Sequence, residues 1–472
     1  MNKKTVNIIT LSLILLYIGA FIWWFSYDSY TGLATQEPGA DERPASLVRA
    51  ADDVRIGEFF MKYDVEETQG LSGKWARFRG DDYTNVLETE KLNVPEGDYP
   101  IVWTLELGGE GHAAPAIYNG RVYILDYDEK LNSDMLRCFN LTDGKELWRR
   151  WYRVPMKRNH GFSRTIPAVT DNYLVTVGPR GHVMCVNPVS GDLLWTLDIE
   201  KEYESEIPFW YTGQCPLIDN GIAIFATGGK ALLIGVDCAT GEVVWETPND
   251  KNYKMSHSSI IPMTLAGKRM YVYMAVGGIC GISADPADMG RLLWVSEKWS
   301  PTVIAPSPIQ TSPNTLFLVA GYGAGASVLN IAQSGGSFTA TTTLQYKSNE
   351  GAASEQQTPL LYKNKLYTVL PKDGGSMRNR LVVYSPSDPK TSLWASGTDE
   401  RFGLGPYIII NDQLYIFKEE GELCVYQLSG NEPKLLKSQT LIEGVDAWGP
   451  IAYADGHLIV RDAHHIVTLK IN

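Results

Sequence analysis

Residues 235–245 read GVDCATGEVVW, and the same phrase returns as CVNPVSGDLLW at residues 185–195 and as CFNLTDGKELW at residues 138–148. In each copy a small residue lies ten positions before a Trp, and a Gly that ends a polar turn lies four positions before that Trp. The copies recur every 45 to 50 residues. A period of this length is typical of a chain built from repeated supersecondary units.

Looser copies continue the repeat toward the C-terminus, at Leu293-Trp294 and Leu393-Trp394, while residues 424–430 keep the turn without the Trp. A second marker precedes each phrase and consists of a Pro, a short strand, a polar turn and another strand. It occurs eight times, at Pro115, Pro167, Pro216, Pro262, Pro308, Pro359, Pro406 and Pro450. Several of its turns contain Asn-Gly or Asp-Gly, which favour tight hairpins. Eight units of four short strands predict an all-β fold, an eight-bladed β-propeller over residues 99–472.

The last unit, residues 450–472, contains no Trp of its own. A spare strand, residues 101–103, lies before the first marker, and its Trp103 is 45 residues from Trp148, which keeps the period. We therefore expect this strand to become the outer strand of the last blade. Such pairing would close the ring and leave no large unpaired edge.

An uncharged apolar run, residues 8–25, follows Lys3 and Lys4. As a helix it would span about 27 Å, close to the ~30 Å hydrocarbon core of a membrane. Basic residues before the run and acidic residues after it predict that the propeller lies outside the cytoplasm. We expect residues 1–25 to be a signal-anchor helix in the cell membrane, with the propeller on the periplasmic side. A cleaved signal peptide, cut near residues 32–34, is the alternative, and it would give a secreted propeller.

Residues 26–98 are expected to form a linker between the apolar run and the propeller. Within it residues 75–80 read WARFRG, an aromatic and basic stretch in polar surroundings. We expect Trp75 and Phe78 to dock on the side of the propeller and hold the linker there. The alternative is that the stretch is a partner-binding peptide.

Composition narrows the function further. The net charge is −12, and Lys and Arg do not cluster beyond adjacent pairs, which argues against nucleic-acid binding. An oxidising compartment would permit disulfides among the six Cys. However, Cys138, Cys185 and Cys424 occupy the same position of the repeat, so they should lie in different sheet-to-sheet cores as free thiols. The absence of a Cys-x-x-Cys pattern leaves little support for a zinc or redox site.

The repeated phrase resembles the tryptophan-docking motif of the pyrroloquinoline quinone (PQQ)-like β-propellers, and the resemblance covers roughly residues 99–472. WARFRG is similar to the Trp-x-x-Phe-Arg-Gly segment that precedes the propeller in many bacterial members. The resemblance implies that certain Trp side chains pack between neighbouring blades, namely Trp103, Trp148, Trp195, Trp245, Trp294 and Trp394. It also implies one of two functions. Quinoprotein dehydrogenases bind PQQ and calcium in the central funnel and oxidise alcohols or sugars, whereas BamB-like propellers are non-catalytic and bind proteins or peptides.

The funnel of a propeller is lined by the innermost strands and by the loops that lead into them. Here those loops contribute the candidate binding residues His112, Arg164, Gln214, His257, Glu355, Gln356, Arg401, Asp446 and Trp448. A calcium–quinone site needs hard oxygen ligands, a carboxylate base and a flat floor. Glu355 and Asp446 could supply the carboxylates, and Trp448 could supply the floor.

Other features of the sequence argue against catalysis. There are no adjacent cysteines, no haem-attachment motif and no cluster of Asp, Asn and Glu that resembles the metal site of the dehydrogenases. We therefore expect no catalytic residue, no metal and no cofactor, and we keep a PQQ- and calcium-dependent dehydrogenase as the alternative function.

The first hypothesis is a membrane-anchored scaffold that binds protein or peptide partners, with envelope or outer-membrane protein assembly as the process that the resemblance suggests. The loop at residues 203–211 reads YESEIPFWY and turns from acidic to aromatic. Phe209, Trp210 and Tyr211 are its candidate partner contacts. The alternative is that these aromatic side chains fold into the funnel as local core.

Overall fold

The computed structural model describes residues 2–27, 54–430 and 432–471, in two compact units divided after Asp53. The described part of the first unit is one helix, α1 (Lys3–Ser26), which begins after Asn2, whose side chain accepts a hydrogen bond from the Lys4 amide. By length and composition α1 could cross a membrane, as an N-terminal signal or anchor does. The predicted cleavage position at residues 32–34 and most of the first half of the linker lie outside the described residues.

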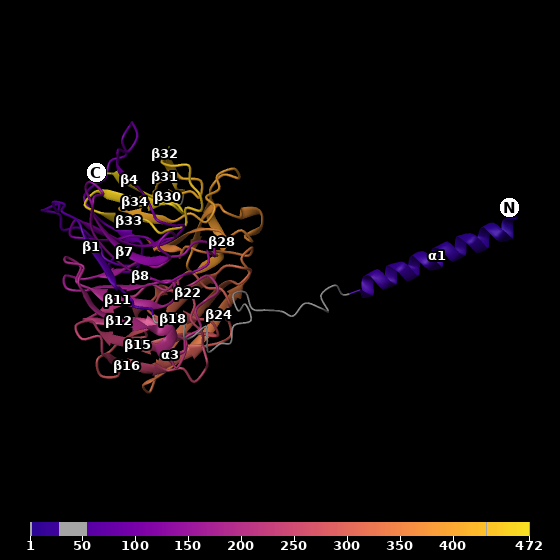
Figure 1. Ribbon diagram of the computed structural model, residues 1–472, viewed down its shortest axis with the longest axis horizontal. Coiled ribbons are helices and arrows are strands. Elements are labelled where there is room, and N and C mark those ends of the chain that lie inside the picture. Colours follow the sequence, from indigo (N-terminus) through magenta and orange to yellow (C-terminus); the bar gives the residue numbers. More distant parts are fainter. Residues whose placement is uncertain (1, 28–53, 431, 472) are drawn as a thin grey trace. The chain divides into compact units, whose positions relative to one another are not determined.

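Within the described part of the second unit the strands form eight sheets that follow one another along the chain, which confirms the predicted eight-bladed β-propeller (Figure 1). Blade 1 contains β5 (Ala116–Tyr118), β6 (Arg121–Asp128), β7 (Ser133–Asn140) and β8 (Glu146–Arg153), and blade 2 contains β9 (Ala168–Val169), β10 (Leu174–Val177), β11 (His182–Val186) and β12 (Leu193–Asp198). Blade 3 contains β13 (Leu217–Asp219), β14 (Ile222–Ala226), β15 (Ala231–Asp237) and β16 (Val243–Pro248). Blade 4 contains β17 (Ile261–Leu265), β18 (Lys268–Ala275), β19 (Gly278–Ser283) and β20 (Leu292–Ser296).

Blade 5 contains β21 (Ile309–Ser312), β22 (Thr315–Ala320), β23 (Gly325–Ser334) and β24 (Ser337–Tyr346). Blade 6 contains β25 (Leu360–Tyr362), β26 (Lys365–Val369), β27 (Leu381–Ser385) and β28 (Asp388–Ala395). Blade 7 contains β29 (Tyr407–Ile410), β30 (Gln413–Phe417), β31 (Glu422–Gln427) and β32 (Lys434–Thr440). A short helix, α3 (Ile199–Tyr203), follows blade 2, and a single 3-10 turn, η1 (Gly375–Met377), lies within blade 6. In each blade the first strand is the innermost, and it enters from a loop on the funnel side.

Blade 8 joins the two ends of the propeller. It contains β33 (Ala452–Ala454), β34 (His457–Arg461), β35 (His465–Lys470) and, as its outer strand, β4 (Ile101–Glu106) from the start of the ring. β4 pairs antiparallel with β35, with Trp103 opposite Thr468. Figure 1 shows β4, from early in the chain, in the same blade as the yellow β34. The predicted ring closure is confirmed.

A buried arginine strengthens the same closure. Arg461 is 1% exposed, and its guanidinium donates to the carbonyls of Ala113 (2.8 Å), Asp462 (2.8 Å) and Ala463 (2.9 Å). The Ala113 carbonyl belongs to the loop that leads into blade 1, so this side chain links the last blade to the first. Burial lowers the pKa of Arg461 to about 10.

Four of the predicted docking tryptophans pack against the turn glycine of the next blade. The pairs are Trp103 with Gly144, Trp148 with Gly191, Trp195 with Gly241 and Trp245 with Gly290. A Cβ atom on any of these glycines would lie 2.7 to 2.9 Å from the ring it faces, and all four have φ between +67° and +81°. The repeat therefore needs glycine there both for backbone conformation and for space. The indole N–H groups of Trp103 and Trp195 donate at 2.8 Å to carbonyls of the same turns, at Leu141 and Cys238.

This arrangement ends midway round the ring. Trp294 lies against Gly281 of its own blade and donates to the Met270 sulfur at 3.2 Å. Trp394 is half-buried, and the turn glycine of the following blade, Gly430, has no atom within 4 Å of a Cβ position. Where the phrase in the sequence erodes, the Trp–glycine contact between blades is absent, although Trp294 still packs with Leu316 and Ile331 of blade 5 in one buried cluster.

Residues 54–98 run along the propeller rather than away from it. β1 (Phe59–Lys62) pairs with β8 as an extra outer strand of blade 1. Further on, β2 (Lys74–Trp75) pairs antiparallel with β5, and β3 (Val86–Leu87) pairs parallel with β29. Residues 74–87, which we call the floor segment, therefore join the innermost strands of blades 1 and 7.

Between these two strands the floor segment contacts other blades through single hydrogen bonds. The Ala76 carbonyl accepts from the Val169 amide at 2.8 Å in blade 2, and the Arg77 guanidinium donates to the Ile218 carbonyl at 3.3 Å in blade 3. Trp75 and Phe78 thus lie at the end of the central channel, not on the outer side of the propeller where the sequence analysis placed them. The physical reason is that the innermost strands present unpaired edges there, and the segment supplies their partners.

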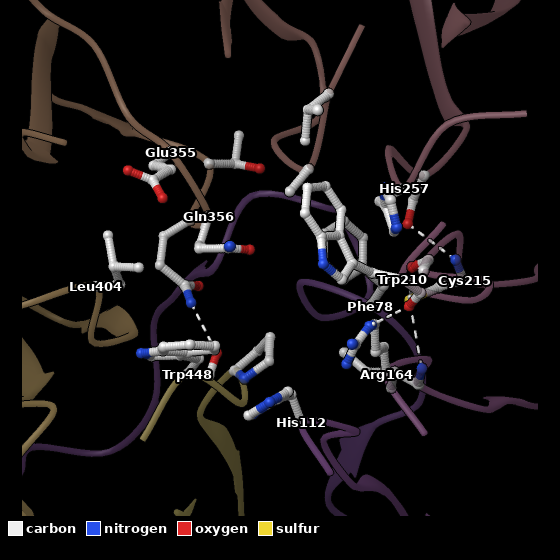
Figure 2. Close-up of a pocket in the computed structure, with 18 of the residues that line it drawn as sticks. Phe78, His112, Arg164, Trp210, Cys215, His257, Glu355, Gln356, Leu404 and Trp448 are labelled. Carbon is white, nitrogen blue, oxygen red and sulfur yellow. Dashed lines mark hydrogen bonds between the residues drawn. The ribbon is translucent and has the colours of Figure 1, made fainter. Parts of the chain in front are cut away.

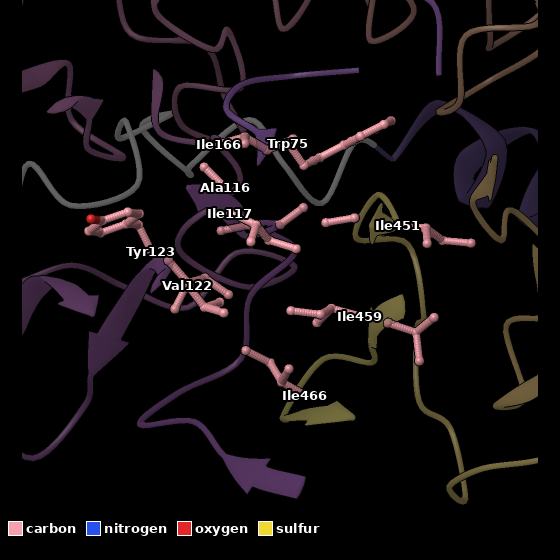
Figure 3. Packing of buried hydrophobic residues seen from close by; sticks show 14 of the residues in the cluster. Trp75, Ala116, Ile117, Val122, Tyr123, Ile166, Ile451, Ile459 and Ile466 are labelled. Carbon is pink, nitrogen blue, oxygen red and sulfur yellow. The ribbon is translucent and has the colours of Figure 1, made fainter. Parts of the chain in front are cut away.

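The residues of the WARFRG stretch make different contacts at this position. Trp75 is 3% exposed and packs beside Ala116, Ile117 and Ile166 (Figure 3). Its ring leaves room only for glycine at Gly80, where φ is +78° and a Cβ would lie 2.8 Å from the ring.

Arg79 is 5% exposed and donates to three carbonyls, those of Tyr83 (2.7 Å), Thr84 (2.9 Å) and Thr358 (3.2 Å). Two of these bonds fold the segment onto itself, and the third attaches it to blade 6. Burial lowers the pKa of Arg79 to about 10.

All six cysteines are buried and free. Cys138, Cys185 and Cys424 lie in three different packing clusters, as their common position in the repeat predicted. Burial raises the pKa of the Cys424 thiol to about 12, so this thiol remains protonated at neutral pH and packs as a small apolar side chain.

Candidate functional site

A cavity of about 270 Å³ lies between the floor segment and the loops that lead into the innermost strands (Figure 2). Six of the nine funnel residues proposed from the sequence line it: His112, Arg164, His257, Glu355, Gln356 and Trp448. Trp210, proposed from the partner loop, lines it as well. These residues come from blades that are far apart in the sequence, so the ring itself brings them together.

Three proposed residues do not face the cavity. Gln214 is 1% exposed, and its side chain bonds to the main chain of Ala226 as both donor and acceptor. Arg401 donates to the Arg378 carbonyl, and Asp446 lies in a turn with φ +49°. None of the three is among the residues that line the cavity.

Arg164 holds the loops on one side of the cavity together through carbonyl groups. Its guanidinium donates to the carbonyls of Trp210 (2.6 Å), Asn159 (2.8 Å) and His160 (2.7 Å). Among the described residues no carboxylate lies within ion-pair distance of it, and its Nη1 is buried without a hydrogen-bond partner. Burial lowers the pKa of Arg164 to about 10, which still leaves it charged at neutral pH.

Two histidines flank this charge. His112 is 8% exposed and has one ring nitrogen, Nε2, 3.1 Å from the His160 carbonyl, while its Nδ1 has no partner. The Nε2 atom of His257 is also buried without a partner. Burial and the nearby Arg164 charge lower the pKa of His257 to about 4 and that of His112 well below its usual range. Both rings are therefore neutral at physiological pH.

Aromatic rings form much of the remaining wall. Trp210 is stacked on Tyr322, with ring centroids 5.8 Å apart and an interplanar angle of 19°, and it lies 6.2 Å from the His257 ring. On the other side Trp448 lies 4.8 Å from the His112 ring and donates from Nε1 to Glu419 at 2.7 Å. Next to Trp210, Phe209 is 77% exposed, so the aromatic surface continues from the cavity to the outside.

The wall opposite Arg164 is acidic and amidic. Figure 2 shows Glu355 and Gln356 across the cavity from Arg164. Burial raises the pKa of Glu355, and the carboxylates of Asp373 and Glu419 add to this effect, while Lys372 opposes it. The cavity thus has a basic side, an acidic side and aromatic surfaces between them.

This residue set does not fit a calcium–quinone site. Calcium takes six to eight oxygen ligands, mostly carboxylates and carbonyls, whereas Glu355 is the one carboxylate among the residues that line the cavity. Over residues 2–27, 54–430 and 432–471 no group of three or more His, Cys, Asp or Glu side chains could hold a metal ion. These lining residues can bind a ligand that has an apolar or aromatic group and a charged or polar end.

Sequence reasoning missed several lining residues. Phe78, Arg79 and Asn85 reach the cavity from the floor segment, and Tyr322 and Lys372 reach it from loops within blades 5 and 6. The WARFRG stretch indicated that this segment docks on the propeller, but not which surface of the propeller it contacts. Tyr322 lies in a Gly-rich loop, with φ +56° at the Tyr itself, and nothing in that loop pointed to the funnel.

Comparisons with known proteins agree on the fold. A family model described as outer membrane protein assembly factor BamB matches residues 98–207, 132–396 and 212–468. No curated protein matches the chain significantly.

Among solved structures the chain is similar to BamB from Moraxella catarrhalis, with 11% identity, a TM-score of 0.53, and coverage of 79% of this chain and 100% of that one. It is also similar to a europium-containing methanol dehydrogenase, with 11% identity, a TM-score of 0.57, and coverage of 83% and 90%. A third similar structure is the quinohemoprotein alcohol dehydrogenase from Comamonas testosteroni, with 10% identity, a TM-score of 0.59, and coverage of 84% and 80%. At these identities the likeness shows the fold alone, and proteins of different function share it.

Proposed function

The chain belongs to the PQQ-like β-propeller repeat family whose model is described as outer membrane protein assembly factor BamB, and from this membership we propose that it is a non-catalytic scaffold that binds protein or peptide partners. α1 acts as an uncleaved anchor, and the propeller works outside the cytoplasm. Residues 26–98 are the linker between the two parts, and the floor segment within it pairs with blades 1 and 7. Assembly of envelope or outer-membrane proteins is the process in which we place it.

One observation carries the proposal. The loop after α3 presents an aromatic surface that begins outside the funnel at Phe209, 77% exposed, and continues through Trp210 into the cavity. Tyr211 fixes this loop, because its hydroxyl donates to the Lys157 carbonyl at 2.5 Å. A large exposed aromatic side chain beside a half-buried one, on a loop held by main-chain hydrogen bonds, is the arrangement of an interface hot spot. The alternative, that all three side chains are local core, does not account for the exposure of Phe209.

The dehydrogenase remains the second candidate, supported by the likeness of the fold to the two alcohol-oxidising enzymes. The lining of the cavity counts against it, because one carboxylate cannot serve both as a calcium ligand and as a base.

Site-specific photocrosslinking in intact cells tests the scaffold proposal. A photoreactive amino acid in place of Phe209 is expected to give discrete crosslinked partner bands. The same group in place of Leu194, which is 44% exposed on the outer strand of blade 2, should give none of these bands and serves as the matched control.

Combining the Phe209 crosslinker with Trp210→Ala should reduce the crosslinked product roughly tenfold or more, since truncating an aromatic hot spot costs about 2 kcal/mol. The melting temperature should remain unchanged, because the loop is held by main-chain contacts. Equal crosslinking from both positions, or a folded Trp210→Ala protein that keeps its partner, would contradict the proposal.

A further inference from the structure

The cavity contains a positive charge that nothing in the described structure neutralises. The three hydrogen bonds of Arg164 go to carbonyl oxygens, its Nη1 has no partner, and its nearest charged neighbours do not form an ion pair with it. Glu110, the carboxylate with the largest electrostatic effect on Arg164, is bound to Arg158 instead. Arg79 and Arg461 are also buried with three carbonyl acceptors each, but none of their guanidinium nitrogens is left without a partner, whereas Nη1 of Arg164 is. Leaving part of a buried charge unpaired is costly, and an anion at Nη1 would remove this cost.

Unpartnered polar atoms gather around this charge. Nδ1 of His112, which is 8% exposed, and Nε2 of His257 are both buried without a hydrogen-bond partner. Both rings line the same cavity as Arg164 and are affected by its charge, so the three groups are close together. Buried polar groups in folded proteins are almost always satisfied, and three orphaned nitrogens in one cavity indicate a polar ligand.

We propose that this cavity binds the carboxylate end of a partner polypeptide, with the terminal α-carboxylate on Arg164 Nη1, N–H groups of the same peptide toward the free histidine nitrogens, and an apolar or aromatic final side chain against Trp210 and Trp448. The inference rests on the proposed function and deepens it, because it names the part of the partner that enters the funnel. Charge complementarity favours this occupant, because the carboxylate would give Arg164 the anionic partner that it does not have in the described structure. The aromatic lining selects an apolar side chain beside the anion.

The opposite wall contributes to the choice of ligand. Gln356 lines the cavity and makes no hydrogen bond within the part of the chain that the structure describes, so its amide is available to a peptide group. Glu355 lies on the same wall and would repel a second carboxylate when ionised. The cavity therefore favours a ligand with one negative end over a dicarboxylate. Free carboxylic acids share this chemistry with a chain terminus, and the extra contacts to Gln356 and to the loop at Phe209 separate the two.

Calorimetric titration of the full chain in detergent tests the inference with three probes: acetyl-Ala-Ala-Phe with a free carboxylate, the same peptide as its C-terminal amide, and acetyl-phenylalanine as a free acid. The peptide acid is expected to bind at least about tenfold more tightly than the amide, because a hydrogen bond to a charged group is lost in the amide. It should also bind more tightly than acetyl-phenylalanine. Equal affinity for peptide acid and amide would overturn the inference without any mutation. Tighter binding of acetyl-phenylalanine would assign the cavity to small free acids and overturn the choice of a chain terminus.

Two variants test whether Arg164 causes the difference in affinity between the peptide acid and the peptide amide. Arg164→Met should remove the difference between acid and amide, while Arg180→Met should keep it, because Arg180 pairs with Glu200 outside the cavity. If Arg164→Met does not fold, the acid–amide comparison on the unaltered protein still decides.

The outcomes also separate the inference from the proposed function. Equal binding of acid and amide that Trp210→Ala abolishes would keep the funnel as a peptide site and discard the carboxylate. Failure of all three probes, together with crosslinking at Phe209, would place the partner on the loop alone and likewise discard it.

Discussion

Trp103→Ala is expected to lower the free energy of unfolding by roughly 3–5 kcal/mol, the usual cost of truncating a large buried side chain to Ala. Trp103 is 8% exposed, packs on Gly144 of blade 1 and donates to the Leu141 carbonyl. Its loss removes both the apolar contact and the hydrogen bond at the junction where β4 joins the last blade to the first. Chemical denaturation monitored by circular dichroism gives the unfolding free energy directly.

Trp394→Ala is the matched control, because Trp394 is half-buried and the turn glycine of the next blade has no neighbour within reach of a Cβ. We expect its cost to be clearly smaller than that of Trp103→Ala. Gly144→Ala should reproduce the Trp103 effect, since φ is +67° and the new Cβ would lie 2.7 Å from the Trp103 ring. Equal costs at Trp103 and Trp394 would show that the closing strand contributes no more than any other blade contact.

Arg79→Met is expected to destabilise the protein by about 3–5 kcal/mol. The change leaves the carbonyls of Tyr83, Thr84 and Thr358 without their donor, and each buried polar group left unsatisfied costs ~1–3 kcal/mol. Because the floor segment would detach, the cavity next to Phe78 should open, and peptide binding should weaken together with stability. Thermal unfolding and the calorimetric titration above measure the two effects.

Arg55→Met serves as the control for Arg79→Met, since the Arg55 side chain is 79% exposed and forms one surface ion pair with Glu58. Such a pair contributes at most about 1 kcal/mol. Arg79→Lys should be almost as damaging as Arg79→Met, because one ammonium cannot reach three carbonyls in the geometry of the guanidinium. A protein with Arg79→Met that melts like the unaltered one would contradict the role assigned to the floor segment.

The ring could be predicted from the sequence because its information is repeated. A Trp and a turn glycine occupy fixed positions in each copy of the phrase, and at four junctions the Trp of one blade packs on the turn glycine of the next blade, as Trp195 does on Gly241. The extra strand at Trp103 was recognisable for the same reason, since it kept the period. The fifth unit was predicted from its marker, Pro308, without a clear copy of the phrase, and β21 to β24 confirm that it is a blade.

The floor segment could not be placed from the sequence in the same way. Nothing repeats in residues 74–87, and the partners of Arg77, Arg79 and Asn85 are main-chain carbonyls of blades 3, 6 and 7, which have no sequence signature. The cavity was only partly predictable for a related reason. The marker Pro locates the loops that lead into the funnel, but the direction of a side chain such as Gln214 depends on local hydrogen bonds that only the folded chain shows.

The fold alone does not separate the two functions that it is known to support, since the chain is about as similar to BamB as to two alcohol dehydrogenases. The lining of the cavity favours the proposed scaffold, because its single carboxylate is too few for a calcium site. The central claim is therefore that the funnel is a binding site without redox chemistry.

Calorimetric titration of the full chain with PQQ, in the presence and absence of calcium, tests this claim most directly. The account predicts that calcium makes no difference to the titration, and that any weak binding is lost equally with Arg164→Met in both conditions. Micromolar or tighter binding that requires calcium would contradict it and assign the protein to the dehydrogenases.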